Sequence, residues 1–233
     1  MSGFLRLMFG LLLLPACWGV ARVFLDALFV AAGSVGFSAE AVSLVGGIAA
    51  FGLCWMTVPH PVKTYVLGHE LTHALWSLAF GGRPSDLRVG ASGGSVRLTK
   101  TNFLVTLAPY FFPFYTFVVI VAGLVTYAFL RPLPFLPLWL FLIGFTWTFH
   151  FLFTLETLTE RQPDIRIYGR VFSWTVIFLV NVVLLLVWFA ATTDVTFAGL
   201  GSGFLDRVGG AYVGTWNGAV AVFRFVGSLF SGK

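Results

Sequence analysis

The amino-acid sequence predicts an all-α polytopic membrane protein with about six transmembrane helices and one small cytosolic β-hairpin. Of its 233 residues, 58% are hydrophobic and only 10% are charged, and the mean hydropathy is +0.94. A soluble domain carries roughly 25% charged residues, which excludes a water-soluble monomer. Four intervals contain no Asp, Glu, Lys or Arg: 41–62, 101–130, 132–155 and 171–193. Each is long enough for a helix to cross a bilayer, and continuous apolar runs favour helices over membrane strands.

The first expected span contains two charged residues. Six apolar segments form the predicted bundle: 7–32, 42–58, 64–81, 103–129, 133–155 and 171–192. Arg22 and Asp26 are four residues apart in the first segment, so they can neutralise each other on one helix face. Leu-Pro-Ala-Cys, ending at Cys17, resembles a lipoprotein signal, but apolar sequence continues after it. We therefore expect a retained membrane helix there, and neither Cys17 nor Cys54 indicates a disulfide framework.

The second and third segments are expected to form a helical hairpin over 42–81. Pro59-His60-Pro61 separates them, and proline removes a backbone donor and disfavours helix in the residue before it. This arrangement predicts that His60 is an exposed loop residue at the far end of the hairpin.

A polar interval follows at 82–101 and predicts a β-hairpin over 86–99. Leu87-Arg88-Val89 and Val96-Arg97-Leu98 alternate in polarity around a Gly/Ser-rich turn. This interval and the loop 156–170 are both rich in Arg and Lys, so the positive-inside rule predicts that both are cytoplasmic. With six spans, this topology places the N-terminus outside, although Arg6 is its early charge.

Three regions are expected along the chain. The N-terminal membrane helices occupy 1–61, the membrane core occupies 62–192, and a Gly-rich amphipathic tail occupies 193–233. Four bulky residues recur at four-residue spacing in the tail, as if to dock on a partner: Phe204, Val208, Tyr212 and Trp216.

The pattern that carries chemistry lies in the third apolar segment, which contains His69-Glu70-Leu71-Thr72-His73. Two His at i and i+4 share one helix face and can bind one metal ion, and Glu70 lies beside that face as a general base. Zinc suits two imidazoles, an oxygen ligand and an open fourth position. The alternative is a polar seam between helices without a metal. Ionisable residues inside a membrane are costly, and a divalent cation offsets that cost.

The segment 62–182 resembles the site-2 protease (M50) family of intramembrane zinc metalloproteases, in particular its small M50B-like branch. The resemblance rests on the His-Glu-x-x-His helix, the Gly81-Gly82 step, the hairpin, Leu107-Ala108-Pro109-Tyr110 and Gln162-Pro163-Asp164-Ile165. It implies that His69, His73 and Asp164 bind zinc and that Glu70 is catalytic. The family's usual Leu-Asp-Gly is replaced here by Asp164 with Gly169 five residues later.

A second candidate for the third ligand is His150. Counted from the expected cytosolic helix ends, His73 and His150 both lie about 10 to 12 Å deep at 1.5 Å per residue, so they are level with each other. His150 is therefore an alternative third ligand, a residue that orients a ligand, or a helix-to-helix hydrogen-bonding group. Asp164 is alternatively a solvated charge next to the membrane.

These features favour a zinc-dependent intramembrane endopeptidase that cleaves membrane-spanning substrates near the cytosolic face. The hairpin edge can pair with an extended substrate, and we expect Val96, Leu98 and Pro109 to contact it. One alternative is a non-proteolytic structural or assembly subunit of a larger membrane complex that retains the metal site. Another is a metal-dependent hydrolase of a lipid or small molecule. The expected location is the bacterial inner membrane, with the lipid bilayer and a membrane protein as partners and no nucleic acid.

Overall fold

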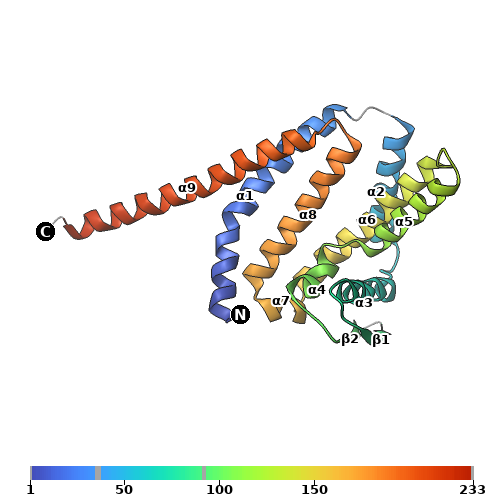
Figure 1. Cartoon of the computed structure of the whole chain (residues 1–233), viewed down its shortest axis with the longest axis horizontal. Coiled ribbons are helices and arrows are strands. Elements are labelled where there is room, and N and C mark those ends of the chain that lie inside the picture. Colours follow the sequence, from blue (N-terminus) through green and yellow to red (C-terminus); the bar gives the residue numbers. More distant parts are fainter. Residues whose placement is uncertain (1, 35–37, 91–92, 232–233) are drawn as a thin grey trace. The chain divides into compact units, whose positions relative to one another are not determined.

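The computed structural model describes residues 2–34, 38–90 and 93–231 (Figure 1). Over these ranges the chain is mostly helical, with nine α-helices, one 3-10 helix and one antiparallel pair of strands. In chain order the elements are α1 (Gly3–Ser34), α2 (Ala39–Thr57), α3 (Val62–Ala79), β1 (Pro84–Gly90), β2 (Gly93–Leu98), α4 (Phe103–Leu107), η1 (Ala108–Tyr110), α5 (Phe114–Phe129), α6 (Leu136–Thr159), α7 (Pro163–Tyr168), α8 (Arg170–Thr192) and α9 (Phe197–Ser231).

Four helices in the described part of the chain are long and apolar enough to cross a membrane: α1, α2, α6 and α8. The pair Phe103–Tyr110 and Phe114–Phe129, bent by 85°, makes a fifth if it is one span. These helices indicate an integral membrane protein. The predicted span 64–81 corresponds to α3, which is not among the candidates, so the structure supports four or five of the six predicted spans.

The chain divides into two compact units. One comprises Met1–Val35 and Tyr168–Lys233, and the other comprises Gly36–Ile167. The boundaries expected from the sequence, at 61 and 192, do not coincide with these divisions. All the residues of the predicted metal site lie in the second unit.

Helices α2 and α6 in the second unit run parallel in close contact. A Cβ atom at Gly47 would clash with the backbone of Phe141, and one at Gly144 would clash with the backbone of Leu44. Small residues permit such close backbone approach between membrane helices. Farther along, Phe51 and Phe149 meet edge to face with ring centroids 5.4 Å apart. Because partner numbers rise together along both helices, α2 and α6 end on the same side.

Helix α5 forms an antiparallel hairpin with α6. The hydroxyls of Thr116 and Thr146 lie 3.0 Å apart near one end, and Gly123 lies against the Trp139 ring toward the other. The first residue of α5 is therefore at the end of the unit where α2 and α6 terminate.

The two helices expected to form a hairpin over 42–81 are present, but they do not pack alongside each other along their length. Helix α2 packs on α6, whereas α3 packs on β1, β2, α4, η1 and α5. Figure 1 shows α3 lying across the end of the second unit where α2 terminates. The two prolines around His60 redirect the chain, but composition alone does not show that the following apolar helix stays at this end.

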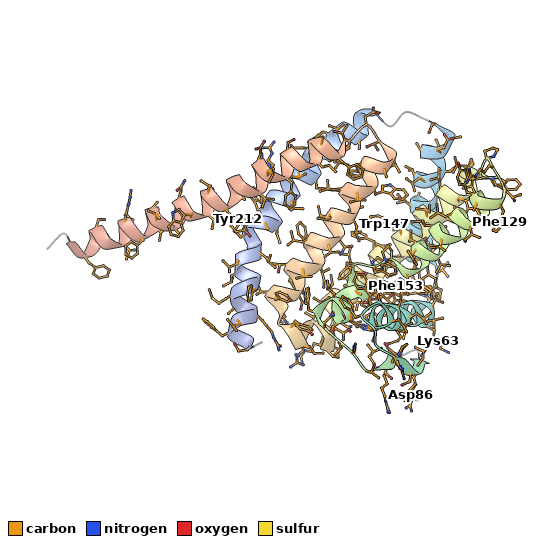
Figure 2. The ribbon with its side chains drawn as sticks, viewed as in Figure 1. Lys63, Asp86, Phe129, Trp147, Phe153 and Tyr212 are labelled. Carbon is orange, nitrogen blue, oxygen red and sulfur yellow. The ribbon has the colours of Figure 1, made fainter. Side chains whose placement is uncertain are left out.

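His60 was also expected to be exposed, and the structure buries part of it. Its ring stacks on Trp55 with centroids 3.7 Å apart, and its Nδ1 lies 3.6 Å from Glu156 Oε1 at the end of α6. Figure 2 labels Phe153, which comes from α6 and stacks on Tyr65 of α3 at 4.7 Å. These aromatic contacts, together with Phe51, Val66 and Phe149, form the core that fixes α3 against α2 and α6.

Helix α3 ends at the predicted glycine step. Gly81 has φ +72°, which favours glycine, and Gly82 N donates to Ser77 O at 2.7 Å. The chain then enters the predicted β-hairpin, with Pro84 opposite Leu98 and Arg88 opposite Ser95. This confirms the hairpin, although turn residues 91–92 lie outside the described ranges.

The first unit is built on α1. Helix α8 runs parallel to it, with Gly10 against Phe172 and Val20 in a shared core with Val182. Helix α9 runs antiparallel to α1, and Tyr212 Oη donates to Leu12 O at 2.7 Å. Two residues of the expected docking face, Val208 and Tyr212, thus contact α1 of the same chain.

The expected neutralisation of Arg22 by Asp26 is wrong. Asp26 instead pairs with Arg207 of α9, whose Nη2 lies 2.8 Å from Asp26 Oδ2. A contact between residues 181 positions apart was not visible in the local i, i+4 pattern.

Candidate metal centre

Helix α3 places His69 and His73 one turn apart, as their spacing predicts. Their ring centroids are 4.9 Å apart, and both rings direct Nε2 toward the same carboxylate oxygen, Asp164 Oδ2. Each Nε2 lies 3.4 Å from that oxygen. The helix backbone therefore supplies two nitrogen donors that converge on one point.

Asp164 comes from the first turn of α7, which begins at Pro163. Ile165, the next residue, is only 4% exposed and anchors this short helix in the protein interior. One ligand atom from each of His69, His73 and Asp164 falls within 4.8 Å of the others. The structure thus brings together the three residues that the family resemblance implies.

The charge of Asp164 is stabilised by its surroundings. Burial disfavours the carboxylate, but hydrogen bonds and charge interactions with His69 and His73 outweigh burial and hold the pKa of Asp164 well below its usual range. Asp164 therefore carries a negative charge at neutral pH and could serve as an oxygen ligand.

Tyr110 is a site residue to which the sequence assigned no role. It is fully buried, and its hydroxyl donates to Asp164 Oδ2 at 3.2 Å. Its ring also contacts that of His69, with centroids 5.5 Å apart. Its position next to Pro109 in the Leu-Ala-Pro-Tyr motif is the sequence feature that could have identified Tyr110 as a site residue. In the structure Tyr110 orients the carboxylate of Asp164.

The other ring nitrogen of His73 is held by the backbone. Nδ1 lies 2.9 Å from Val105 O, and because a carbonyl oxygen can only accept, the N–H is on Nδ1 and the lone pair of Nε2 faces the site. The Val105 backbone is itself fixed, because Val105 N donates to Asn102 Oδ1 at 2.9 Å at the start of α4. Metal-binding His residues are commonly oriented by such a second contact.

His69 has no corresponding partner among the described residues. Its Nδ1 is buried without a hydrogen bond, and the same is true of His150 Nε2 and Thr154 Oγ1 on α6. His69 and His150 are close enough for their charges to interact. His150 lies outside the three-residue ligand group, so the structure brings Asp164 rather than His150 to the two His ligands.

The depth argument for His150 assumed that α3 crosses the membrane. Helix α3 is not among the candidate spans, and Asp164 lies only five residues after the last residue of α6. The site is therefore near the end of α6 rather than 10 to 12 Å along a spanning α3.

Glu70 is buried beside the ligand face, with 7% of its surface exposed. The hairpin covers it closely: a Cβ atom at Gly94 would lie 2.9 Å from Glu70 Cγ and 2.6 Å from Val66 Cγ1. Only glycine permits β2 to approach α3 this closely. Val96 and Leu98, farther along β2, are partly exposed, whereas Pro109 is buried in η1.

The donor set fits a divalent metal ion. Two imidazole nitrogens and one carboxylate oxygen are ligands that zinc accepts, and three protein ligands leave a fourth position open. The geometry shows that these residues could hold a metal ion. The choice of zinc rests on the chemical type of the three donor atoms and not on the geometry. Comparison of the chain with protein-family models, curated proteins and solved structures finds no match.

Proposed function

We propose that this protein is a zinc-dependent endopeptidase of the site-2 protease type, which cleaves membrane-protein substrates near a membrane surface. The observation that carries the proposal is the convergence of His69, His73 and Asp164 within 4.8 Å, with Glu70 buried next to them. Neutral peptide hydrolysis needs an activated water and a polarised carbonyl, and this donor set suits the metal ion that provides both.

Each residue of the site has a defined task in this mechanism. His69, His73 and Asp164 would hold the zinc ion, which would supply Lewis acidity to a water molecule and to the scissile carbonyl. Glu70 accepts a proton from the attacking water and delivers it to the leaving amine nitrogen when the C–N bond breaks. Tyr110 holds the carboxylate of Asp164, and Val105 O holds the ring of His73.

His150 is proposed as a positioning residue for His69. Both carry a buried ring nitrogen without a hydrogen-bond partner, and a ligating imidazole generally needs a group on its second nitrogen. A buried water that also reaches Thr154 would satisfy all three side chains, since such waters typically make about three hydrogen bonds. This role agrees with the absence of His150 from the ligand group.

The hairpin supplies a surface for the substrate. A two-stranded sheet leaves one edge of each strand unpaired, and an extended peptide can add to such an edge. β2 passes directly over Glu70, so a peptide paired with this hairpin runs close to the zinc ligands. We propose Val96 and Leu98 as substrate contacts, whereas the burial of Pro109 suits a structural role.

The proposed setting is the cytoplasmic face of a bacterial inner membrane. The hairpin and the segment 156–170 carry the clustered Arg and Lys residues, which favours their retention in the cytoplasm. The site adjoins both segments, so cleavage is expected near that face.

An assembly subunit is the second candidate function. It is favoured by the second half of α9, where Trp216, Phe223 and Phe230 are 70%, 79% and 82% exposed. Such a surface fits a partner in a larger membrane complex.

The Glu70→Gln variant separates the two functions. The amide cannot accept a proton, so zinc content and folding should be unchanged while cleavage of a co-expressed single-span membrane protein falls about 10²- to 10⁴-fold. Equal cleavage by wild type and variant would overturn the protease mechanism. An inactive wild type with a full zinc site would favour the assembly subunit.

A further inference from the structure

A cavity of about 380 Å³ lies in the second unit, away from the ligand face of α3. Its walls come from the last turns of α2, the first turn of α3, the start of α5 and the middle of α6. Cys54, Trp55, Tyr115 and Phe149 are among the lining residues. Cavities of a few hundred Å³ with apolar walls are typical ligand sites.

Two hydroxyl groups of the wall already donate to backbone carbonyls. Tyr115 Oη donates to Thr64 O at 2.6 Å, and Thr146 Oγ1 donates to Leu142 O at 2.7 Å. The rest of the wall is mostly apolar, so it offers a buried water few of the two to four polar partners that it needs. The cavity therefore favours an apolar occupant over water.

The surroundings define what that occupant is. Helices α2 and α6 are candidate spans, and α5 belongs to the bent pair that completes a fifth. The cavity therefore lies among helices apolar enough for hydrocarbon, next to the turn where α2 gives way to α3. We propose that it binds one acyl chain of a membrane phospholipid. A methylene group occupies roughly the volume of a water molecule, about 30 Å³, so the cavity accommodates on the order of ten carbon atoms.

The bound chain supports the helix that carries the metal ligands. Tyr115 forms part of the wall and is hydrogen-bonded to Thr64, and its ring lies against Gly68, the residue before His69. A Cβ atom at Gly68 would be only 2.8 Å from that ring. A chain packed behind Tyr115 thus holds this contact in place, whether or not the site is proteolytic.

Quenching of Trp55 fluorescence by brominated phospholipid tests the proposal. The full-length protein is reconstituted into phosphatidylcholine vesicles with or without dibrominated acyl chains, and the signal of Trp55 is obtained by subtracting the matched Trp55→Phe protein. Bromine quenches indole on contact, so most of the Trp55 signal should be lost in the wild type.

Cys54→Phe fills the cavity and should reduce this quenching severalfold, with a smaller reduction for Cys54→Leu. Leu53→Phe is the matched control, because Leu53 is 63% exposed on the same helix and does not line the cavity. It should quench like the wild type. Circular dichroism melting identifies any variant that does not fold. If Cys54→Phe does not fold, the quenching of Cys54→Leu tests the proposal.

Two results would overturn the proposal. One is equal quenching in wild type and in the folded Cys54 variants. The other is quenching by a free brominated fatty acid when brominated phospholipid gives none, which would reject the phospholipid as the source. A second readout follows from mass action: removing lipid should lower the Tm of the wild type more than that of Cys54→Phe.

Discussion

Asp164 Oδ2 lies 3.4 Å from His73 Nε2, joining the first turn of α7 to the middle of α3. The same oxygen lies 3.4 Å from His69 Nε2 and accepts a hydrogen bond from Tyr110 at 3.2 Å. A single carboxylate thus gathers three side chains from two other elements. Loss of Asp164 should affect both the metal site and the local packing of α7.

Metal binding should require the two His residues of α3. The purified wild type is expected to contain one zinc ion per chain, and the His69→Ala, His73→Ala double variant should contain none, because removal of both imidazoles leaves one protein ligand. Elemental analysis after dialysis measures the ratio. Unchanged zinc content in the double variant would contradict the assignment.

Asp164 and His150 should differ in their effect on zinc. Asp164→Asn removes a charged ligand and should release the metal, whereas His150→Gln removes only a positioning group and should weaken affinity about 10- to 100-fold. Competition with a chromophoric chelator gives both affinities. If only His150→Gln released zinc, His150 would be the third ligand and Asp164 would be the positioning residue.

Tyr110→Phe removes the hydroxyl that holds Asp164 and keeps the ring. Zinc affinity should fall about 10- to 100-fold, the range for loss of a group that orients a ligand. Tyr127→Phe is the matched control, because Tyr127 is 44% exposed on α5. Equal affinity in both variants would show that Asp164 is positioned without Tyr110.

Membrane topology should follow five spans rather than six. When α3 is not counted as a span, the N-terminus and the basic hairpin are expected on one side and Thr193 on the other. Single Cys residues at positions 2, 95 and 193, in a background without Cys17 and Cys54, can be labelled with an impermeant maleimide. Six spans would instead place positions 2 and 193 together.

This topology also accounts for Arg6. Six spans place the N-terminus opposite the basic loops, which separates Arg6 from them. Five spans place Arg6 on the same side as the Arg and Lys residues of the hairpin.

Local patterns predicted the parts of this protein that depend on neighbours in sequence. The i, i+4 spacing of His69 and His73 brings the two rings together in any α-helix, and the alternation around 86–99 sufficed for the β-hairpin. Apolar composition identified α1, α2, α6 and α8, because hydrocarbon requires it, whereas the 35-residue helix α9 was expected only as a Gly-rich amphipathic tail.

Long-range contacts decided what the sequence could not. An apolar helix that packs across the end of other helices has nearly the same composition as a spanning one, so composition counts α3 as a sixth span whereas the structure supports four or five. Asp26 pairs with Arg207 of α9, which is distant in the sequence, and not with Arg22 four residues before it. Asp164 could be assigned only from the family resemblance, since its place beside His69 depends on how α7 folds back.

The parallel packing of α2 on α6 has a consequence for biogenesis. Parallel neighbours cannot be joined by a short turn, and here 78 residues separate Thr57 from Leu136. At a synthesis rate of 5–20 residues per second, roughly 4 to 16 s pass before α6 begins to emerge. During that time Gly47 of α2 lacks its contact with the Phe141 backbone of α6. An insertase or chaperone that shields this glycine face would therefore act on the chain before the metal site can assemble.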